Sequence, residues 1–397
     1  MMKWFRRVFS GLLSVSVLLI VGLFALTSFI RYPDPVAAYQ LATSVTSEQP
    51  NLMPVHKIPA SANPHQWQVA TEFESLPERI NFEGSEYLTE QLLADTATKA
   101  FLVVRDGEIT YEWYSADWTP ERQMNTMSVG KTMLGIAAGV LISEGSLRES
   151  AAITEYLTEY ADVPRLNEVT VKHLLDMQSC IGIEDDYPSG PEGWLSPISQ
   201  MFATTDMNHV LSSHLSVICE PGSEEYEYRS VNSQLLGMIV SRVSGESLSD
   251  FFTKRVWQPL GTSYPASWSV DRVGGSEKSF CCFNAAARDL ALIGQLFLNS
   301  GKIPFGENKG GQVMSGDWYA RMTTPAKTWF GGYGSETFGA NMWHKPNEQL
   351  VSQGYRGQFI WINRYTNTVV VKLSDDVENL YYDQVVAMLD QISFNRN

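Results

Sequence analysis

The sequence predicts an α/β fold of the α+β kind, with one antiparallel sheet built from both ends of the folded region. Near the start of that region, the strand-like runs 100–105 and 108–114 flank a tight Asp106-Gly107 turn. Near the end of the chain, the runs 358–363 and 368–373 flank a polar turn in the same way. Both hairpins are rich in Val, Ile and aromatic residues, so we expect them to join in one sheet.

Helical patterns fill the region between the two hairpins, with apolar residues at three- and four-residue spacing. These patterns cover 127–141, 169–177, 232–243 and 285–298, and a last one follows the second hairpin over 376–392. We therefore expect a mainly helical lobe over 128–334, inserted into an α/β lobe formed by 76–127 and 335–397. A groove between two such lobes is a natural place for a substrate.

The N-terminus predicts attachment to a membrane or export across it. Lys3, Arg6 and Arg7 precede an apolar run over 9–31 that is long enough to span a bilayer as a helix. The basic residues within 1–8 should stay in the cytoplasm, which places the rest of the chain on the other side. We expect an inner-membrane anchor with the folded domain in the periplasm or outside the cell. The alternative is a signal sequence that is removed before secretion.

Residues 32–75 are rich in proline, together with Ser, Thr, Gln and Asn. This composition is typical of an extended linker. We expect the linker to hold the folded domain, 76–397, away from the membrane.

Composition excludes some classes of partner and cofactor. The net charge of −15 over 397 residues argues against nucleic acid, because phosphate binding needs a basic surface. The four cysteines and six histidines match no zinc-site spacing, so no metal is expected. Cys180 and Cys219 could pair in an oxidising compartment, while the sequence leaves open whether the adjacent Cys281 and Cys282 are bridged. It also leaves the oligomeric state open.

The first candidate site is Ser128-Val-Gly-Lys131, at the start of a strongly apolar helical pattern. Residues three apart share a helical face, so the Ser128 hydroxyl and the Lys131 amine can point to one spot. A lysine at the end of a buried helix loses solvation, which lowers its pKa and lets it take a proton from the hydroxyl. The motif alone also fits a helix-start serine followed by a lysine whose chain reaches water.

The second candidate is Tyr228-Arg-Ser230-Val-Asn232. Alternate side chains of an extended segment share a face, so Tyr228 and Ser230 can line one surface. The phenol could relay a proton if a nearby ammonium lowered its pKa. The structural alternative is a tyrosine packed under a loop.

The third candidate is Gly354-Tyr-Arg-Gly357-Gln358, which leads into the last hairpin. The glycines let the backbone come close to a ligand, and main-chain N–H groups there can bind an oxyanion. The structural alternative is a glycine bulge at the entry to a strand.

In order along the chain, these motifs resemble those of the class C β-lactamase and DD-peptidase family of serine hydrolases, closest to the branch of esterases and 6-aminohexanoate-dimer hydrolase. The resemblance runs from about residue 80 to the C-terminus. It is carried by Ser128-x-x-Lys131, Pro221-Gly-Ser-x-x-Tyr-x-Tyr228-x-Ser-x-Asn232, Pro259-Leu-Gly261, Cys281-Cys-Phe-Asn-Ala-x-x-Arg-Asp289 and Gly354-x-x-Gly-Gln358. It implies a β-lactamase/transpeptidase-like fold and acyl-enzyme chemistry without a metal or organic cofactor.

By this resemblance Ser128 is the nucleophile, Lys131 helps to deprotonate it, and Tyr228 relays the proton to the leaving group. The backbone N–H groups of Ser128 and Tyr355 would form the oxyanion hole. The implied substrate-binding residues are Ser230, Asn232, Gly354, Gly357 and Gln358.

The chain departs from the family at Ser352-Gln-Gly354, where β-lactamases and DD-peptidases carry Lys-Thr-Gly, and at Tyr228-x-Ser230, where they carry Tyr-x-Asn. Both changes point away from β-lactams. We therefore expect an exported serine hydrolase that cleaves a small ester or amide. The alternatives are a DD-peptidase or β-lactamase acting on peptidoglycan-like or β-lactam substrates, and a catalytically silent binding homologue. The acidic loop 184–187 fits either a preference for a cationic substrate or a solvated face.

Overall fold

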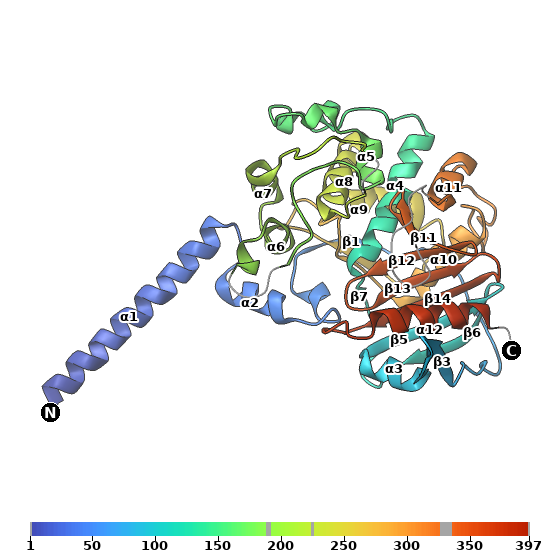
Figure 1. Ribbon diagram of the computed structural model, residues 1–397, viewed down its shortest axis with the longest axis horizontal. Helices are drawn as coiled ribbons and strands as arrows, with labels where there is room; N and C mark the ends of the chain where they lie inside the picture. Colours follow the sequence, from blue (N-terminus) through green and yellow to red (C-terminus); the bar gives the residue numbers. More distant parts are fainter. Residues whose placement is uncertain (1, 188–191, 224–225, 326–335, 396–397) are drawn as a thin grey trace.

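A large sheet forms the centre of the molecule, with helices on both of its faces (Figure 1). The computed structural model describes residues 2–187, 192–223, 226–325 and 336–395. Within these residues the sheet has eight strands, in the spatial order β10 (Thr337–Gly339), β11 (Met342–Lys345), β12 (Gln349–Gly354), β13 (Gln358–Asn363), β14 (Thr368–Ser374), β5 (Thr98–Arg105), β6 (Glu108–Tyr114) and β2 (Gln68–Val69). Neighbouring strands are antiparallel, except that β2 runs parallel to β6.

Both ends of the folded region contribute to this sheet, which confirms the predicted architecture. β14, from the C-terminal hairpin, lies between β13 and β5, with Val370 opposite Val103. Side chains alternate between the two faces, so Val103 and Val370 pack in one core with α3 (Thr89–Asp95) and α12 (Tyr382–Phe394). Their strand neighbours pack in a second, larger core with α10 (Ala287–Leu298) and the helical lobe.

The helical lobe contains α4 (Gly130–Ser143), α5 (Val171–Leu175), α6 (Pro197–Ala203), α7 (Met207–His214), α8 (Ser230–Ser244), α9 (Leu248–Phe252) and α11 (Gly316–Thr323). Helix α4 is buried over nearly all its length and packs on α8. Short 3-10 and π turns connect these helices: η3 (Ile153–Glu155), η4 (Thr158–Tyr160), η5 (Leu166–Glu168), η6 (Gly193–Leu195) and η7 (Thr253–Trp257). The expected lobe boundary at 334–335 lies outside the described residues.

Two smaller sheets were not predicted from the sequence. One has four strands within the described residues, in the order β1 (Val55–Ile58), β8 (Ala266–Ser269), β9 (Phe283–Ala285) and β7 (Met124–Asn125). The other is the hairpin of β3 (Arg79–Phe82) and β4 (Ser85–Leu88). These strands have only two to four residues each, which is too short for a clear alternating pattern.

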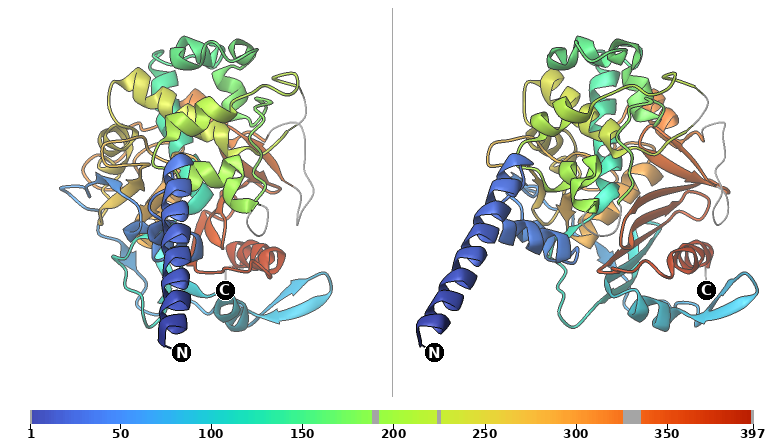
Figure 2. Two further views of the ribbon diagram at one scale, coloured as in Figure 1. Left: turned by 90° about the vertical axis from the view of Figure 1, so that its left-hand side faces the viewer. Right: turned by 60° about the vertical axis from the view of Figure 1, so that its left-hand side comes forward.

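The N-terminal helix α1 (Met2–Phe29) projects away from the body of the molecule (Figures 1 and 2). Its segment Leu12–Phe29 is long and apolar enough to cross a membrane. A helix of this kind near the N-terminus occurs both in membrane anchors and in signal sequences.

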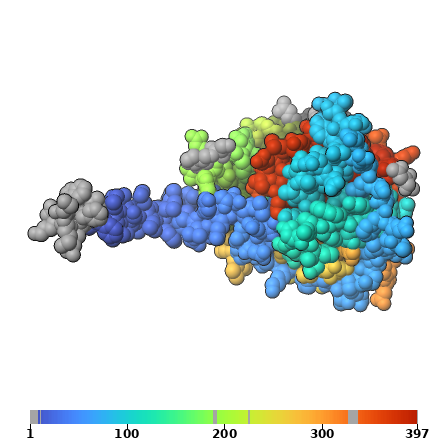
Figure 3. All heavy atoms as spheres, turned by 90° about the horizontal axis from the view of Figure 1, so that it is seen from below, coloured from blue at the N-terminus to red at the C-terminus, as the bar shows by residue number. Residues whose placement is uncertain are grey.

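The extended linker expected over 32–75 is wrong, because this segment is folded onto the domain. We call residues 31–49 the strap; it contains α2 (Pro35–Thr43) and leads into η1 (Gln49–Asn51). The Asp34 side chain caps α2 and Pro35 occupies its first turn, while Ala38 and Leu41 are buried against the body. After the strap, β1 pairs with β8 and β2 with β6. Figure 3 shows the chain continuing from α1 onto the surface of the body.

Polar contacts hold the strap at both ends. The Tyr32 hydroxyl donates to the Trp194 carbonyl oxygen at 2.6 Å. At the other end, the Arg356 guanidinium donates to the Ser44 carbonyl oxygen at 2.7 Å. The Asp375 carboxylate accepts from the Thr46 and Ser47 side chains at 2.9 and 2.6 Å. The strap is therefore a part of the folded domain.

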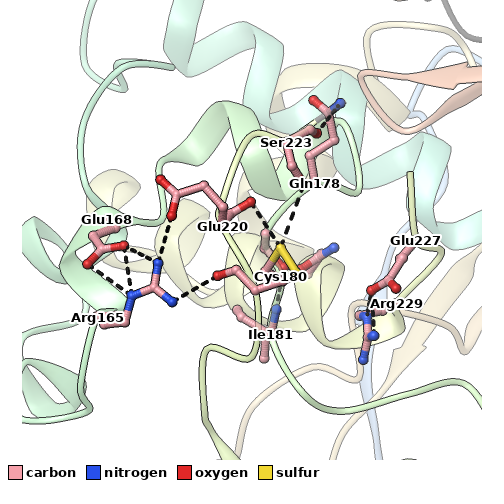
Figure 4. Close-up of a disulfide and its surroundings, with 12 residues drawn as sticks. Arg165, Glu168, Gln178, Cys180, Ile181, Glu220, Ser223, Glu227 and Arg229 are labelled. Carbon is pink, nitrogen blue, oxygen red and sulfur yellow. Dashed lines mark hydrogen bonds and ion pairs between the residues drawn. A yellow bond between two sulfur atoms is a disulfide. The ribbon is translucent and has the colours of Figure 1, made fainter. Parts of the chain in front are cut away.

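A disulfide between Cys180 and Cys219 joins two loops of the helical lobe (Figure 4). The backbone beside it is also paired, because the Ile218 N–H donates to the Cys180 carbonyl oxygen at 2.9 Å. Arg165 reinforces the second loop by donating to the Cys219 carbonyl oxygen and to Glu220, at 3.1 and 3.0 Å. The adjacent Cys281 and Cys282 are also bridged.

Replacing Cys180 and Cys219 by serine is expected to lower the free energy of unfolding by about 2–4 kcal/mol, since the bridge closes a long loop. Urea denaturation of the oxidised proteins measures the difference. Both proteins treated with dithiothreitol serve as the control, and their stabilities should then be equal. Equal midpoints for oxidised wild type and variant would contradict a stabilising role.

Candidate active site

The candidate nucleophile Ser128 lies on a short 3-10 turn, η2 (Met127–Val129), that leads directly into α4. The Met127 N–H donates to Asn125 Oδ1 at 3.0 Å, which holds the start of the turn. Met127 has a φ of 51°, in the left-handed region that residues other than glycine rarely adopt. Backbone held in such a conformation beside a pocket is common at functional sites.

Lys131 follows Ser128 by one helical turn and is only 2% exposed. Its Nζ lies 3.0 Å from Ser128 Oγ and 3.0 Å from Ser230 Oγ, and it donates to the Phe280 carbonyl oxygen at 2.6 Å. Burial disfavours the charged amine and lowers the pKa of Lys131 to about 8, although the negative charge of Asp185 opposes this shift. An amine with this pKa is partly neutral near pH 8, so it can accept the Ser128 proton.

Asp185 extends this hydrogen-bond chain beyond Lys131. The Ser230 hydroxyl donates to Asp185 Oδ2 at 2.6 Å and is free to accept from Lys131 with its own lone pairs. Asp185 Oδ1 accepts from the Ser230 N–H at 2.7 Å, at the first residue of α8. The carboxylate therefore caps α8 and orients the hydroxyl that holds Lys131.

The place of Asp185 in this network was not predicted from the sequence. The sequence indicated only an acidic loop, 184–187, with two possible roles. A signal was nevertheless present in the sequence around α8. The residue that precedes this helix is Arg229, which makes no side-chain cap. A helix that begins without a capping side chain of its own needs a partner from elsewhere in the chain.

The Tyr228 ring lies beside Lys131. It stacks on Trp343 with ring centres 5.9 Å apart and planes 19° apart, and Lys131 Nζ is 4.9 Å from its centre. Burial raises the pKa of Tyr228 and the Asp185 charge adds to this rise, while a hydrogen bond with Ser128 opposes it. The lowering considered from the sequence is therefore not found. Tyr228 is a neutral phenol at physiological pH, suited to pass on a proton.

The end of β12 reaches the turn that carries Ser128. A Cβ added to Gly354 would lie 2.3 Å from the Thr126 carbonyl oxygen and 3.1 Å from Met127 Cβ, so only glycine fits this approach. Ser128, Gly354 and Tyr355 line the same cavity. This arrangement places the backbone of Tyr355 beside the candidate nucleophile.

Three of the predicted substrate-binding residues point elsewhere. Asn232 is fully buried, where its side chain binds Ser179 and the Met177 sulfur. Gly357 lies in the β12–β13 turn with a φ of 81°. Gln358 donates to the Ser374 carbonyl oxygen at 2.6 Å, inside the sheet. Asn232, Gly357 and Gln358 therefore stabilise the structure around the site, whereas Ser230 and Gly354 line the cavity.

The cavity has a volume of about 790 Å³ and an opening at the protein surface. Its walls include the strap, the turn of Ser128, the segment from η6 to α6, and the β11 and β12 strands with the start of α12. Residues of the acidic loop, of the segment that leads into α8 and of the segment before β9 complete the lining. Aromatic side chains dominate the lining, among them Tyr32, Trp194, Phe202, Tyr228, Trp343 and Tyr382. Within the described ranges, no three His, Cys, Asp or Glu side chains gather in a way that could hold a metal ion.

Residues 88–273 match the beta-lactamase family model. The chain is also similar to 6-aminohexanoate-dimer hydrolase from Paenarthrobacter ureafaciens, with 30% identity over 304 residues, which cover 72% of this chain and 74% of the relative. This protein belongs to the beta-lactamase family of serine hydrolases.

Solved structures share the fold of this beta-lactamase-family chain. A Bacillus anthracis protein assigned as a 6-aminohexanoate-dimer hydrolase superposes with a TM-score of 0.73 at 19% identity, covering 91% of this chain and 94% of its own. A family VIII carboxylesterase superposes with a TM-score of 0.57 at 17% identity. The superposition covers 75% of this chain and 92% of the carboxylesterase. The fold is therefore the β-lactamase/transpeptidase-like fold that the motifs implied.

The Asp185→Asn variant is expected to lower kcat/KM for an ester roughly tenfold, the effect of losing one hydrogen bond to a charged group. It should also move the acidic limb of the pH profile to lower pH, because removing the carboxylate charge lowers the pKa of Lys131 further. Asp186→Asn, a change at the exposed neighbouring carboxylate, is the control and should leave kcat/KM and the pH profile unchanged. An unaltered pH profile in Asp185→Asn would contradict its coupling to Lys131.

Proposed function

We propose that this protein is an exported serine hydrolase that cleaves an ester or a small amide through an acyl-enzyme on Ser128. One observation carries the proposal: a buried amine with a pKa of about 8, Lys131 Nζ, lies 3.0 Å from the Ser128 hydroxyl at the wall of a cavity. A serine activated by an adjacent base is the arrangement that nucleophilic catalysis requires.

In the acylation step, neutral Lys131 accepts the proton of Ser128 as Oγ attacks the carbonyl carbon. The Ser230 hydroxyl and the Phe280 carbonyl oxygen then stabilise the resulting ammonium at 3.0 and 2.6 Å. Tyr228, kept neutral by burial, passes a proton to the leaving group. The phenolate left by this transfer then takes a proton from the water that cleaves the acyl-enzyme, and the Lys131 ammonium returns the proton to Ser128 Oγ.

The backbone N–H groups of Ser128 and Tyr355 are the proposed donors to the oxyanion. Ser128 sits at the N-terminal end of α4, where the helix dipole favours negative charge. Tyr355 follows β12 at the close contact of Gly354 with the Ser128 turn. Two such donors stabilise the charge that develops on the carbonyl oxygen in the transition state.

An ester or linear amide fits the site better than a β-lactam. The segment Ser352-Gln-Gly354 lacks the ammonium group that would bind a substrate carboxylate. Ser352 Oγ donates to Thr132 Oγ1 at 2.7 Å, and Gln353 Oε1 accepts from the Tyr382 hydroxyl at 2.6 Å, so both side chains are engaged within the protein. The names of the relatives, a dimer hydrolase and a carboxylesterase, support the same substrate classes.

Export is supported by the apolar N-terminal helix and by the Cys180–Cys219 disulfide, which persists in oxidising compartments. We propose an inner-membrane anchor with the catalytic domain in the periplasm or outside the cell. Secretion after removal of α1 is the second possibility to be tested, by N-terminal sequencing of the mature protein.

A fluorophosphonate probe is expected to label the wild-type protein and not the Ser128→Ala variant, because only an activated serine reacts with it. Ser143→Ala, a change on the same helix but far from Lys131, is the matched control and should label normally. Equal labelling of wild type and Ser128→Ala would overturn the assignment. Absence of labelling in the wild type would favour a catalytically silent homologue. Faster turnover of nitrocefin than of p-nitrophenyl acetate would favour a β-lactamase.

The value of kcat/KM for p-nitrophenyl acetate is expected to rise about tenfold per pH unit below pH 8 and to level off above it. The reason is that Lys131 acts in its neutral form, which predominates only above its pKa. Initial rates corrected for spontaneous hydrolysis, between about pH 6 and about pH 9, give the profile. A flat profile over this range would remove Lys131 as the base.

A further inference from the structure

The strap forms one wall of the cavity that contains Ser128. Tyr32, Ala38, Leu41, Ala42 and Gln49 from the strap line this cavity together with the candidate nucleophile. Tyr32, Ala38 and Leu41 are also packed against the body and are almost inaccessible to solvent. The segment that connects the apolar helix to the domain is therefore also part of the substrate site.

This wall lies close to the end of α1. The helix ends at Phe29, and Tyr32 follows three residues later, a span of at most about 10 Å. The Thr205 N–H donates to the Arg31 carbonyl oxygen at 2.6 Å, which fixes the end of α1 to the domain. Figure 2 shows α1 projecting from the body of the molecule. When α1 spans a bilayer, this short connection holds the strap side of the cavity at the membrane surface.

Exposed apolar side chains lie on the two elements, α2 and η6, that also contribute to this side of the cavity. We define the rim as Val36 and Tyr39 on α2 with Trp194 and Leu195 on η6, whose exposed fractions lie between 39% and 63%. The strap contacts η6 just before α2 begins, since Tyr32 donates to the Trp194 carbonyl oxygen. Tyr and Trp side chains, apolar with one polar end, are enriched where proteins meet the membrane–water interface.

The cavity is also large for a small ester. A volume of about 790 Å³ is near the upper part of the range for drug-sized ligands, which is about 300–1,000 Å³. The lining includes Ala38, Leu41, Ala42 and Phe202, whose apolar side chains can pack against hydrocarbon. An acetyl group would leave most of this surface uncovered.

We propose that the substrate is an ester or amide of a long-chain fatty acid, presented by the membrane, with its chain lying along the strap. The proposal rests on the serine-hydrolase function proposed above and names its substrate class. The bond between the acyl carbon and the leaving oxygen or nitrogen breaks as Ser128 Oγ bonds to that carbon, and the leaving group departs with a proton. Water then adds hydroxyl to the acyl carbon and returns the proton to Ser128, which releases the fatty acid.

The test uses the full chain in phosphatidylcholine vesicles, a zwitterionic surface chosen because the net charge of −15 disfavours anionic lipid. The substrates are p-nitrophenyl acetate, octanoate and palmitate. The value of kcat/KM is expected to rise with chain length, about two- to fourfold for each methylene that becomes buried in the cavity. Equal or falling values along the series overturn the proposal.

Ala42→Trp places a ring in the cavity from an exposed position of α2. It is expected to lower the ratio of kcat/KM for the palmitate ester to kcat/KM for the acetate ester at least tenfold. Gln40→Trp, at an exposed position of the same helix that does not line the cavity, is the matched control and should change neither value. Equal losses on acetate and palmitate in Ala42→Trp overturn the proposal.

The rim is tested with the double variant Val36→Ser/Tyr39→Ser. It should slow hydrolysis of vesicle-borne palmitate ester about tenfold and leave hydrolysis of soluble acetate unchanged. Val69→Ser, at an exposed valine on edge strand β2, is the control and should change neither rate. Unchanged palmitate hydrolysis in the double variant overturns presentation by the membrane. Absence of any Ser128-dependent acetate hydrolysis in the wild type would instead overturn the underlying hydrolase function.

Discussion

The site depends on the burial of one amine, Lys131 Nζ. Removing a lysine from water costs several kcal/mol unless oxygen atoms replace its hydration shell, so its three partners must be held in place. Those partners come from three parts of the chain: the Ser128 turn, the start of α8, and the backbone of Phe280. The packing of α4 against α8, the capping of α8 by Asp185 and the sheet behind Phe280 all serve this arrangement.

The burial of Lys131 also lowers the pKa of its amine, and the proposed reaction depends on this shift. In water the amine would be fully charged at neutral pH, and it would hold the Ser128 hydroxyl without deprotonating it. Burial brings the pKa of Lys131 to about 8, while the Asp185 charge keeps it from falling further. Burial acts in the opposite sense on Tyr228, whose phenol stays protonated. Burial therefore shifts the pKa of Lys131 and the pKa of Tyr228 in opposite directions, as their proposed roles of proton acceptor and proton donor require.

The strap connects the apolar N-terminal helix to the domain and also lines the cavity. Its prolines and polar residues resemble a linker in composition, yet Asp34-Pro35 is also the sequence pattern of a helix start. Ala38 and Leu41 then give α2 a buried face, and Asp375 and Arg356 bind the residues that follow. Only a few residues separate the end of the apolar helix from this wall of the cavity.

The sequence by itself determined the sheet made from both chain ends and the order of the catalytic motifs, because these follow from local periodicity and from side chains close in sequence. It predicted that the Ser128 hydroxyl and the Lys131 amine would point to one spot, and these two groups lie 3.0 Å apart. Only the tertiary structure decided the roles of Asp185, Asn232 and the strap. Asp185 reaches Ser230 across 45 residues, and Asn232 turns inward to Ser179 although its neighbour Ser230 faces the cavity. Such contacts depend on how distant segments pack, and composition does not reveal whether a proline-rich stretch has a surface to pack against.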